Sequence, residues 1–337
     1  SFKYCSTNKH LELIVNSMLF LIVLKINSKT HNFFPLFKSF LLISALFRIF
    51  LSLFLKFIVC KDNLLNELVA NNGLVCELMN VNIVNVGQNF SCNRKTALLT
   101  ERKVGLGDIT DNNNEAEWTL AQTQHARLSA AGIPYSAVRG NHDLPGYGNG
   151  IATDAYTAYM GTADYRAQFE GFYSDDNVAN SWRTFQVGEV KYLMLTLDYG
   201  ANDAVLNWAS GIIEEHPYHN VIITTHAYLF RDGTTMDGGD IVPPSTSGGV
   251  NDGDDMWNKF VSKHANIEMV LSGHIGTNEV IVTRNNAYIG DVVNTVTQML
   301  IDPQTVDSAI GPSGMVTMLY FKNGEPTVQV ETLSTIE

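Results

Sequence analysis

Four short segments of this 337-residue chain carry side chains that could bind metal ions or transfer protons. Carboxylate and amide oxygens combined with imidazole nitrogens suit borderline and hard divalent metals such as Mn, Fe or Zn. Residues 93–337 contain no cysteine, so thiolate ligands are excluded from this part of the chain. In chain order, the four segments are Gly107-Asp108, Gly140-Asn141-His142-Asp143, Thr225-His226 and Gly273-His274.

Each of these segments closely follows a short run that is typical of a β-strand. Because the carboxyl ends of strands in an α/β sheet meet at one edge, we expect the four sets of side chains to converge. A glycine precedes the ligand in three segments, at positions 107, 140 and 273. We expect these glycines to let the backbone turn sharply just before each ligand.

Strand-like and helix-like segments alternate from residue 104 onward, which favours an α/β sandwich. An amphipathic helix is predicted over residues 115–131, ended by Gly132, and a second helix over residues 203–215. The predicted strands are Tyr135–Val138, 221–225 and 268–271, with a weaker alternating run at 81–86. Hairpins are predicted for 181–187 with 190–197 across Gly188-Glu189, and for 315–321 with 327–332 across Asn323-Gly324.

The order GD…GNHD…H…GH resembles that of the calcineurin-like metallophosphoesterases, over residues 104–335. The resemblance implies a four-layer α-β-β-α sandwich, in which two mixed sheets lie between helices. It also implies hydrolysis of phosphomonoesters or phosphodiesters, with metal-activated water as the nucleophile. The cofactors would be two divalent metal ions about 3.5–4 Å apart.

The same resemblance assigns a role to each motif residue. Asp108 would bridge both metal ions, and Asn141, His226 and His274 would complete the coordination of the second ion. A bridging carboxylate is physically sensible because it holds two cations close together while partly neutralising their charge.

Three further motif residues receive roles beside the metal ligands. His142 would be the general acid that protonates the leaving alkoxide, and Asp143 would orient the His142 ring. Asp111 would lie behind the ligands or cap its loop.

The chain departs from the family at two points. The family opens with a D-x-H or D-x-Q motif on its first strand, which supplies two ligands to the first metal, and no such motif precedes Gly107. The family often ends in GHxH, whereas residues 273–276 read GHIG. The alternative is therefore a catalytically impaired phosphoesterase-fold protein that binds a metal or a phosphorylated ligand.

Several residues near the motifs have less specific interpretations. Residues 146–150 (GYGNG) lack the lysine of a phosphate-cradling loop, so we expect a flexible loop beside the site. The acidic run 251–255 is expected to begin a solvated helix rather than bind calcium. The histidines expected at the surface or at helix ends are His125, His216, His219 and His264, and the candidates for lining a substrate cleft are Tyr199, Tyr228 and Asp232.

Charge divides the chain into two parts. Residues 1–100 carry a net charge of +6 and all four cysteines, whereas residues 101–337 carry −18. A strongly acidic domain lacks the basic face that binds nucleic acid, so no nucleic-acid partner is expected. Its lack of cysteine is compatible with an oxidising exterior and with the cytosol.

Residues 1–103 form an atypical hydrophobic and basic segment, and residues 104–337 form the predicted phosphoesterase domain. Residues 39–60 are long enough to span a bilayer, which would make a membrane a partner of the chain and place it at or beyond that membrane. The alternative is a mis-assigned exon, because 11 of the 17 Phe but only 2 of the 26 Gly lie in the first hundred residues. That bias is typical of translated AT-rich non-coding sequence.

Overall fold

The computed structural model describes residues 80–85, 102–305, 307–308, 311–312, 314–323 and 325–334. The membrane helix predicted at 39–60 lies outside these residues. Within the described ranges, no helix is long and apolar enough to cross a bilayer.

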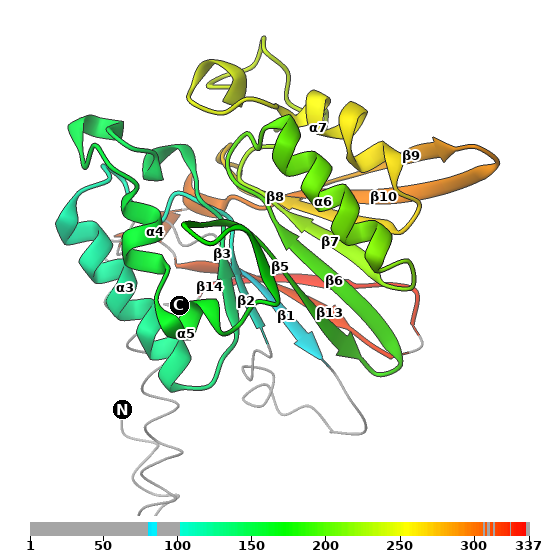
Figure 1. Cartoon of the computed structure of the whole chain (residues 1–337), viewed down its shortest axis with the longest axis horizontal. Coiled ribbons are helices and arrows are strands. Elements are labelled where there is room, and N and C mark those ends of the chain that lie inside the picture. The colour runs from blue at the N-terminus through cyan, green and yellow to red at the C-terminus, as the bar shows by residue number, and fades with distance from the viewer. Residues whose placement is uncertain are drawn as a thin grey trace, which may run out of the picture. The chain divides into compact units, whose positions relative to one another are not determined.

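Two mixed β-sheets form the centre of the fold (Figure 1). The five-stranded sheet has the order β14-β13-β1-β2-β3, and the seven-stranded sheet has the order β4-β5-β6-β7-β8-β10-β9. The strands of the first sheet are β1 (Asn80–Asn85), β2 (Arg102–Gly105), β3 (Tyr135–Ala137), β13 (Met315–Phe321) and β14 (Gln329–Ser334). Those of the second are β4 (Gly171–Ser174), β5 (Asn177–Val187), β6 (Val190–Thr196), β7 (Asn220–Thr224), β8 (Ile267–Ser272), β9 (Ile281–Ile289) and β10 (Val292–Leu300); β11 (Asp307–Ser308) pairs with β12 (Gly311–Pro312).

Helices lie on the outer sides of the two sheets (Figure 1). On one side are α3 (Glu115–Ala130), α4 (Ala155–Met160) and α5 (Ala163–Arg166), and on the other are α6 (Asp203–Glu215) and α7 (Gly253–Lys259). Short 3₁₀ turns complete the connections: η1 (Asn141–Asp143), η2 (Tyr147–Asn149), η3 (Pro244–Thr246), η4 (Val261–Lys263) and η5 (Pro303–Thr305).

Three hydrophobic clusters fill the three spaces between these layers. One lies between the sheets and includes Val104 of β2 and Met194 of β6. A second packs the seven-stranded sheet against α6, and a third packs α3, α4 and α5 around β3. Met194 belongs to the cluster between the sheets, while its neighbours Leu193 and Leu195 belong to the cluster under α6. A strand buried on both faces must be apolar throughout, and the predicted α-β-β-α sandwich is confirmed.

The predicted elements agree with the structure in most of the acidic part. Both long helices and both hairpins are present, and the run at 81–86 corresponds to β1. Strands β9 and β10 were not predicted. Strand β9 is an edge strand whose alternate positions are exposed, and two of these positions hold the polar residues Arg284 and Asn286. Strand β1 pairs with β13 and β2 although it precedes residue 104, and the domain boundary at 103/104 stays a prediction.

His125 corrects one expectation, because it is a core residue and not a surface histidine. Its side chain is 4% exposed, its Nδ1–H donates to the Ala121 carbonyl at 2.8 Å, and its ring lies 5.1 Å from that of Tyr135. Burial, reinforced by the charge of Lys103, lowers the pKa of His125 to about 4. The folded state therefore holds this imidazole in its neutral form.

His125 should make the protein less stable at acid pH. An unfolded histidine has a pKa of about 6.5, so its stabilising contribution is complete above that pH and is lost as the pH falls toward 4. The shift corresponds to about 3 kcal/mol of unfolding free energy. We expect His125→Asn, whose amide can still donate to Ala121, to lose less stability than the wild type between pH 7.5 and pH 4.5 in urea unfolding. Equal losses in both proteins would show that His125 is not held neutral.

Candidate metal centre

The four motif segments lie at the carboxyl ends of four strands, two from each sheet. Asp108 follows β2 and Asn141 follows β3 in the five-stranded sheet, whereas His226 follows β7 and His274 follows β8 in the seven-stranded sheet. The site therefore lies where the strand ends of both sheets meet. The predicted convergence on one edge is confirmed by the contacts among these side chains.

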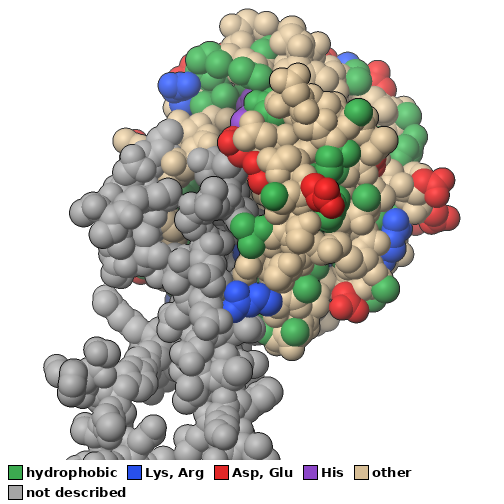
Figure 2. All heavy atoms as spheres, turned by 90° about the vertical axis from the view of Figure 1, so that its left-hand side faces the viewer, with side chains coloured by type: hydrophobic (Ala, Val, Ile, Leu, Met, Phe, Trp, Pro, Cys, Tyr) green, Lys and Arg blue, Asp and Glu red, His purple; other side chains and the backbone are tan. Residues whose placement is uncertain are grey.

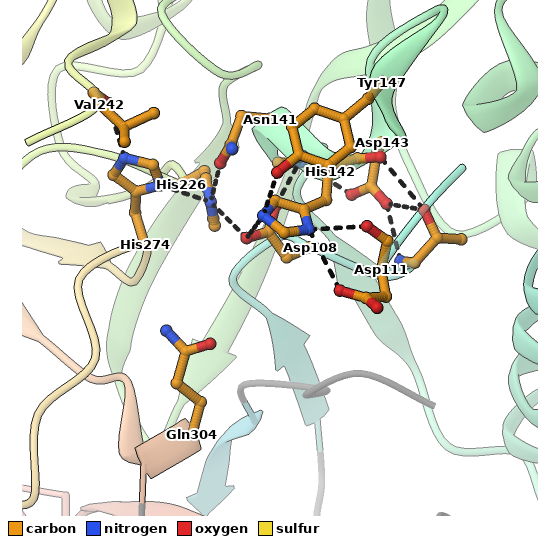
Figure 3. Close-up of polar contacts among 12 residues, drawn as sticks. Asp108, Asp111, Asn141, His142, Asp143, Tyr147, His226, Val242, His274 and Gln304 are labelled. Carbon is orange, nitrogen blue, oxygen red and sulfur yellow. Dashed lines mark hydrogen bonds and ion pairs between the residues drawn. The ribbon is translucent and has the colours of Figure 1, made fainter. Parts of the chain in front are cut away.

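His226 is the centre of this group of side chains (Figure 3). Its Nε2 lies 3.1 Å from Asn141 Oδ1, 3.2 Å from Asp108 Oδ2 and 3.1 Å from His274 Nδ1. Asp108, His226 and His274 offer ligand atoms that all lie within 4.8 Å of one another. The four side chains form one compact donor set.

Hydrogen bonds to backbone carbonyls determine which ring nitrogen of each histidine carries a lone pair that faces the centre. His226 Nδ1–H donates to the Leu106 carbonyl at 2.6 Å, and His274 Nε2–H donates to the Val242 carbonyl at 2.9 Å. In the neutral rings, His226 Nε2 and His274 Nδ1 are then unprotonated. Such carbonyl contacts are the usual support of metal-binding histidines.

Electrostatics favours ionised Asp108 and neutral His274. Burial acts to raise the pKa of Asp108, but the facing His226 and His142 rings more than offset this effect and lower the pKa to about 2. Burial and the nearby His226 lower the pKa of His274 to about 4. Burial lowers the pKa of His226, yet the Asp108 carboxylate more than offsets this effect and raises it. A proton on His226 and a cation would therefore compete for the same position.

These residues fit a divalent cation. One carboxylate oxygen, one amide oxygen and two imidazole nitrogens direct lone pairs at a common centre, where they repel one another unless a positive charge lies between them. The mixture of oxygen and nitrogen donors is that of a borderline metal.

The glycines of the motifs are needed more for space than for turning. A Cβ on Gly107 would lie 2.2 Å from the His226 ring, and a Cβ on Gly140 would lie 2.1 Å from Asp108 Oδ1. The expected sharp turn occurs at Gly107, whose φ is +107°, but Gly140 has an extended backbone. In two places the ligand itself takes the left-handed conformation, with φ of 49° at Asp108 and 76° at His274.

A methyl group at position 140 should therefore disrupt the centre. In Gly140→Ala the new Cβ would collide with the side chain and the backbone nitrogen of Asp108. The Asp108 side chain cannot easily move away, because its Oδ1 accepts the His142 N–H. We expect bound metal per chain, measured by plasma mass spectrometry, to fall at least tenfold. Gly211→Ala is the matched control, because a Cβ there meets nothing within 4 Å and alanine is favoured by up to about 1 kcal/mol in a helix. Full metal content in Gly140→Ala would contradict this packing argument.

The structure assigns Asp143 a different role from the predicted one. Its carboxylate accepts backbone N–H groups from Ile109, Thr110 and Gly140 at 2.8–3.0 Å, so it ties the η1 turn to the loop that carries Asp108. Burial and repulsion from Asp108 raise the pKa of Asp143 to about 6, although the three N–H groups oppose the shift. The expectation that Asp143 orients the His142 ring is corrected.

His142 is held by two other residues. Its Nδ1–H donates to the Asp111 carbonyl at 2.9 Å, and its Nε2 lies 2.8 Å from the Tyr147 hydroxyl and 4.0 Å from Asp108 Oδ2. The Tyr147 ring also stacks on the imidazole with 4.2 Å between centroids. Asp111 thus contacts the His142 ring through its backbone carbonyl, and its predicted role behind the ligands stays a prediction. Tyr147 was missed, and the signal was an aromatic residue within the glycine-rich loop expected beside the site.

Of the three residues expected to line a substrate cleft, only Tyr199 contacts the candidate metal centre. Tyr199 lies beside the centre, with ring centroids 5.7 Å from His226 and 5.6 Å from His274. Tyr228 is fully buried in the core, so its placement in a substrate cleft was wrong, and Asp232 is exposed and bonds within its own turn.

Residues 251–255 do begin a helix, since the Asp252 side chain caps α7. On the face shown in Figure 2, acidic side chains gather beside a visible histidine.

A four-layer sandwich with an Asp-Asn-His-His centre at its strand ends defines the class of protein, a metallophosphoesterase. The family model described as calcineurin-like phosphoesterase matches residues 100–278, more than half of the chain. The chain belongs to the calcineurin-like phosphoesterase family.

Two individual proteins are similar to this chain. The uncharacterised protein YvnB of Bacillus subtilis (strain 168) is 25% identical over 232 residues, which cover 68% of this chain and 16% of that protein. The chain thus spans about a sixth of the length of this relative. A purple acid phosphatase isolated from yellow lupin (Lupinus luteus) seeds is 14% identical, with a TM-score of 0.38, over 76% of this chain and 47% of that chain.

Proposed function

We propose that this chain hydrolyses phosphate esters, either monoesters or diesters, with a water molecule activated at the metal centre as the nucleophile. The observation that carries the proposal is the convergence of three lone-pair atoms, from Asp108, Asn141 and His274, on His226 Nε2. The His142 Nε2 lies 4.0 Å from the same Asp108 carboxylate. Family membership supports the same class of reaction.

In the bound state the metal would lower the pKa of water and neutralise the charge that develops on the phosphoryl oxygens. Asp108, Asn141, His226 and His274 would hold it. His142 would donate a proton from Nε2 to the departing alkoxide, because the Asp111 carbonyl fixes the other ring proton at Nδ1. Tyr147 would keep the imidazole plane aligned by stacking and by its hydroxyl contact.

The alternative is a phosphoesterase fold that binds a metal or a phosphorylated ligand without turnover. The observation that favours it is the absence of D-x-H or D-x-Q before Gly107, together with glycine at position 276. Hydrolysis of an aryl phosphate by the metal-loaded full-length chain, measured beside its metal content, separates the two functions.

Removing the charge of Asp108 should slow the reaction strongly. Asp108→Asn keeps the size of the side chain but loses the anion that faces His226. We expect kcat/KM for an aryl phosphate to fall at least about 10²-fold, because a neutral amide holds a divalent cation more weakly than a carboxylate does. Asp232→Asn is the control, because that exposed carboxylate bonds only within its own turn. Undiminished turnover in Asp108→Asn would refute the assignment.

The role of His142 can be tested by comparing phosphate esters whose leaving groups differ in pKa. His142→Ala should slow alkyl phosphates by on the order of 10²–10⁴-fold, because an alkoxide needs a proton, whereas phenolates with a low pKa can leave unaided. Tyr147→Phe keeps the stacked ring but loses the hydroxyl at His142 Nε2, so we expect the same trend with a smaller slope. The measurement is kcat/KM against the pKa of the leaving group. A His142→Ala loss that is equal for all esters would rule out general-acid catalysis by this residue.

A further inference from the structure

A buried carboxylate follows β10 and has no role in the site described so far. Asp302 is 1% exposed, and its oxygens accept the backbone N–H of Gln304 at 3.3 Å and the side-chain Nε2 of Gln304 at 2.9 Å. Within residues 102–305, no Lys or Arg forms an ion pair with it. Burying a carboxylate without a cation is costly, and burial accordingly raises the pKa of Asp302 to about 6.

Backbone hydrogen bonds place Asp302 beside the turn that carries His274. Strand β10 runs parallel to β8, and the Ile301 N–H continues this pairing by donating to the Ser272 carbonyl at 2.8 Å. The Thr277 N–H then donates to the Asp302 carbonyl at 2.8 Å. Asp302 therefore flanks residues 273–276, and the charges of His226 and Asp108 both act on the pKa of its carboxyl group, the first lowering it and the second raising it.

Gln304 extends from the same segment toward the metal centre. Figure 3 shows its amide directed toward the group of Asp108, His226 and His274, on the side opposite Tyr147. Gln304 Nε2 is used by Asp302, so Gln304 Oε1 is left as a free acceptor in this contact. Pro303 lies between the two residues and restricts the backbone that joins them.

We infer that Asp302 and Gln304 supply oxygen ligands to a second divalent cation, which shares Asp108 with the Asn141-His226-His274 site. Carboxylate and amide oxygens suit hard cations such as Mn²⁺. The tripeptide Asp302-Pro303-Gln304 is also a D-x-Q sequence. It follows β10, whose last three residues are buried, instead of a strand before Gly107. The inference rests on the proposed function, because it completes the same centre.

The test uses Mn²⁺ alone with the full-length chain. Calorimetry and plasma mass spectrometry give Mn²⁺ per chain, and electron paramagnetic resonance shows whether two ions are spin-coupled. We expect two coupled ions in the wild type and one uncoupled ion in Asp302→Asn, with the affinity for the second ion at least about tenfold lower. Asp291→Asn is the control, because Asp291 is exposed at the opposite end of β10.

A second pair of variants guards against misfolding of Asp302→Asn. Gln304→Ala should also lose the second ion, whereas Gln304→Glu, which keeps an oxygen ligand, should retain it. Two coupled ions in both Asp302→Asn and Gln304→Ala would overturn the inference, as would a single ion in the wild type. Turnover of an aryl phosphate with one ion per chain would overturn the inference but leave the proposed function intact. A wild-type chain that neither binds Mn²⁺ nor hydrolyses the ester would overturn both the inference and the proposed function.

Discussion

The hydrogen bond from His226 Nδ1–H to the Leu106 carbonyl, 2.6 Å long, joins the two sheets at their common edge. It connects the end of β7 to the end of β2, and it fixes the ring so that Nε2 faces Asp108. Gly107 makes the contact possible, since any side chain there would enter the imidazole. The cluster of apolar side chains between the sheets holds them at the separation that this bond needs. The donor set exists because two sheets are packed together, not because one loop carries it.

The same arrangement stores strain that the surroundings must offset. The candidate ligands Asp108 and His274 both have positive φ, a conformation that costs on the order of 1–3 kcal/mol for such residues. Hydrogen bonds oppose this cost: the His142 N–H donates to Asp108 Oδ1 at 3.0 Å, and His274 donates to the Val242 carbonyl. A cation at the centre would remove the repulsion among the inward lone pairs. Binding of a cation at this centre would therefore also stabilise the fold, since the unfolded chain has no such site.

What could be predicted from sequence was local. The four ligand segments were recognisable because each lies directly after a strand, and the central strands because burial on both faces makes them apolar throughout. Apart from the convergence of these four segments, contacts between distant residues were not recognisable. Asp143 bonds to backbone 33 and 34 residues earlier in the chain, and His125 is buried by Tyr135 of another element. An edge strand such as β9 is half exposed, so its polar residues concealed it.

The position of Asp302 follows from the same physical rule as the other ligands. A cation requires donors at particular points in space, and the order of those donors along the chain is irrelevant to its binding. Strand β10 runs beside β8 with its end at Ser272, so a residue just after β10 reaches the edge that His274 reaches from β8. The chain lacks D-x-H and D-x-Q before Gly107 but carries Asp302 and Gln304 at this neighbouring strand end. Among residues 102–305 no Lys or Arg pairs with this buried carboxylate. Such a group is a poor way to stabilise a core, and a shared metal centre gives it a physical reason to be there.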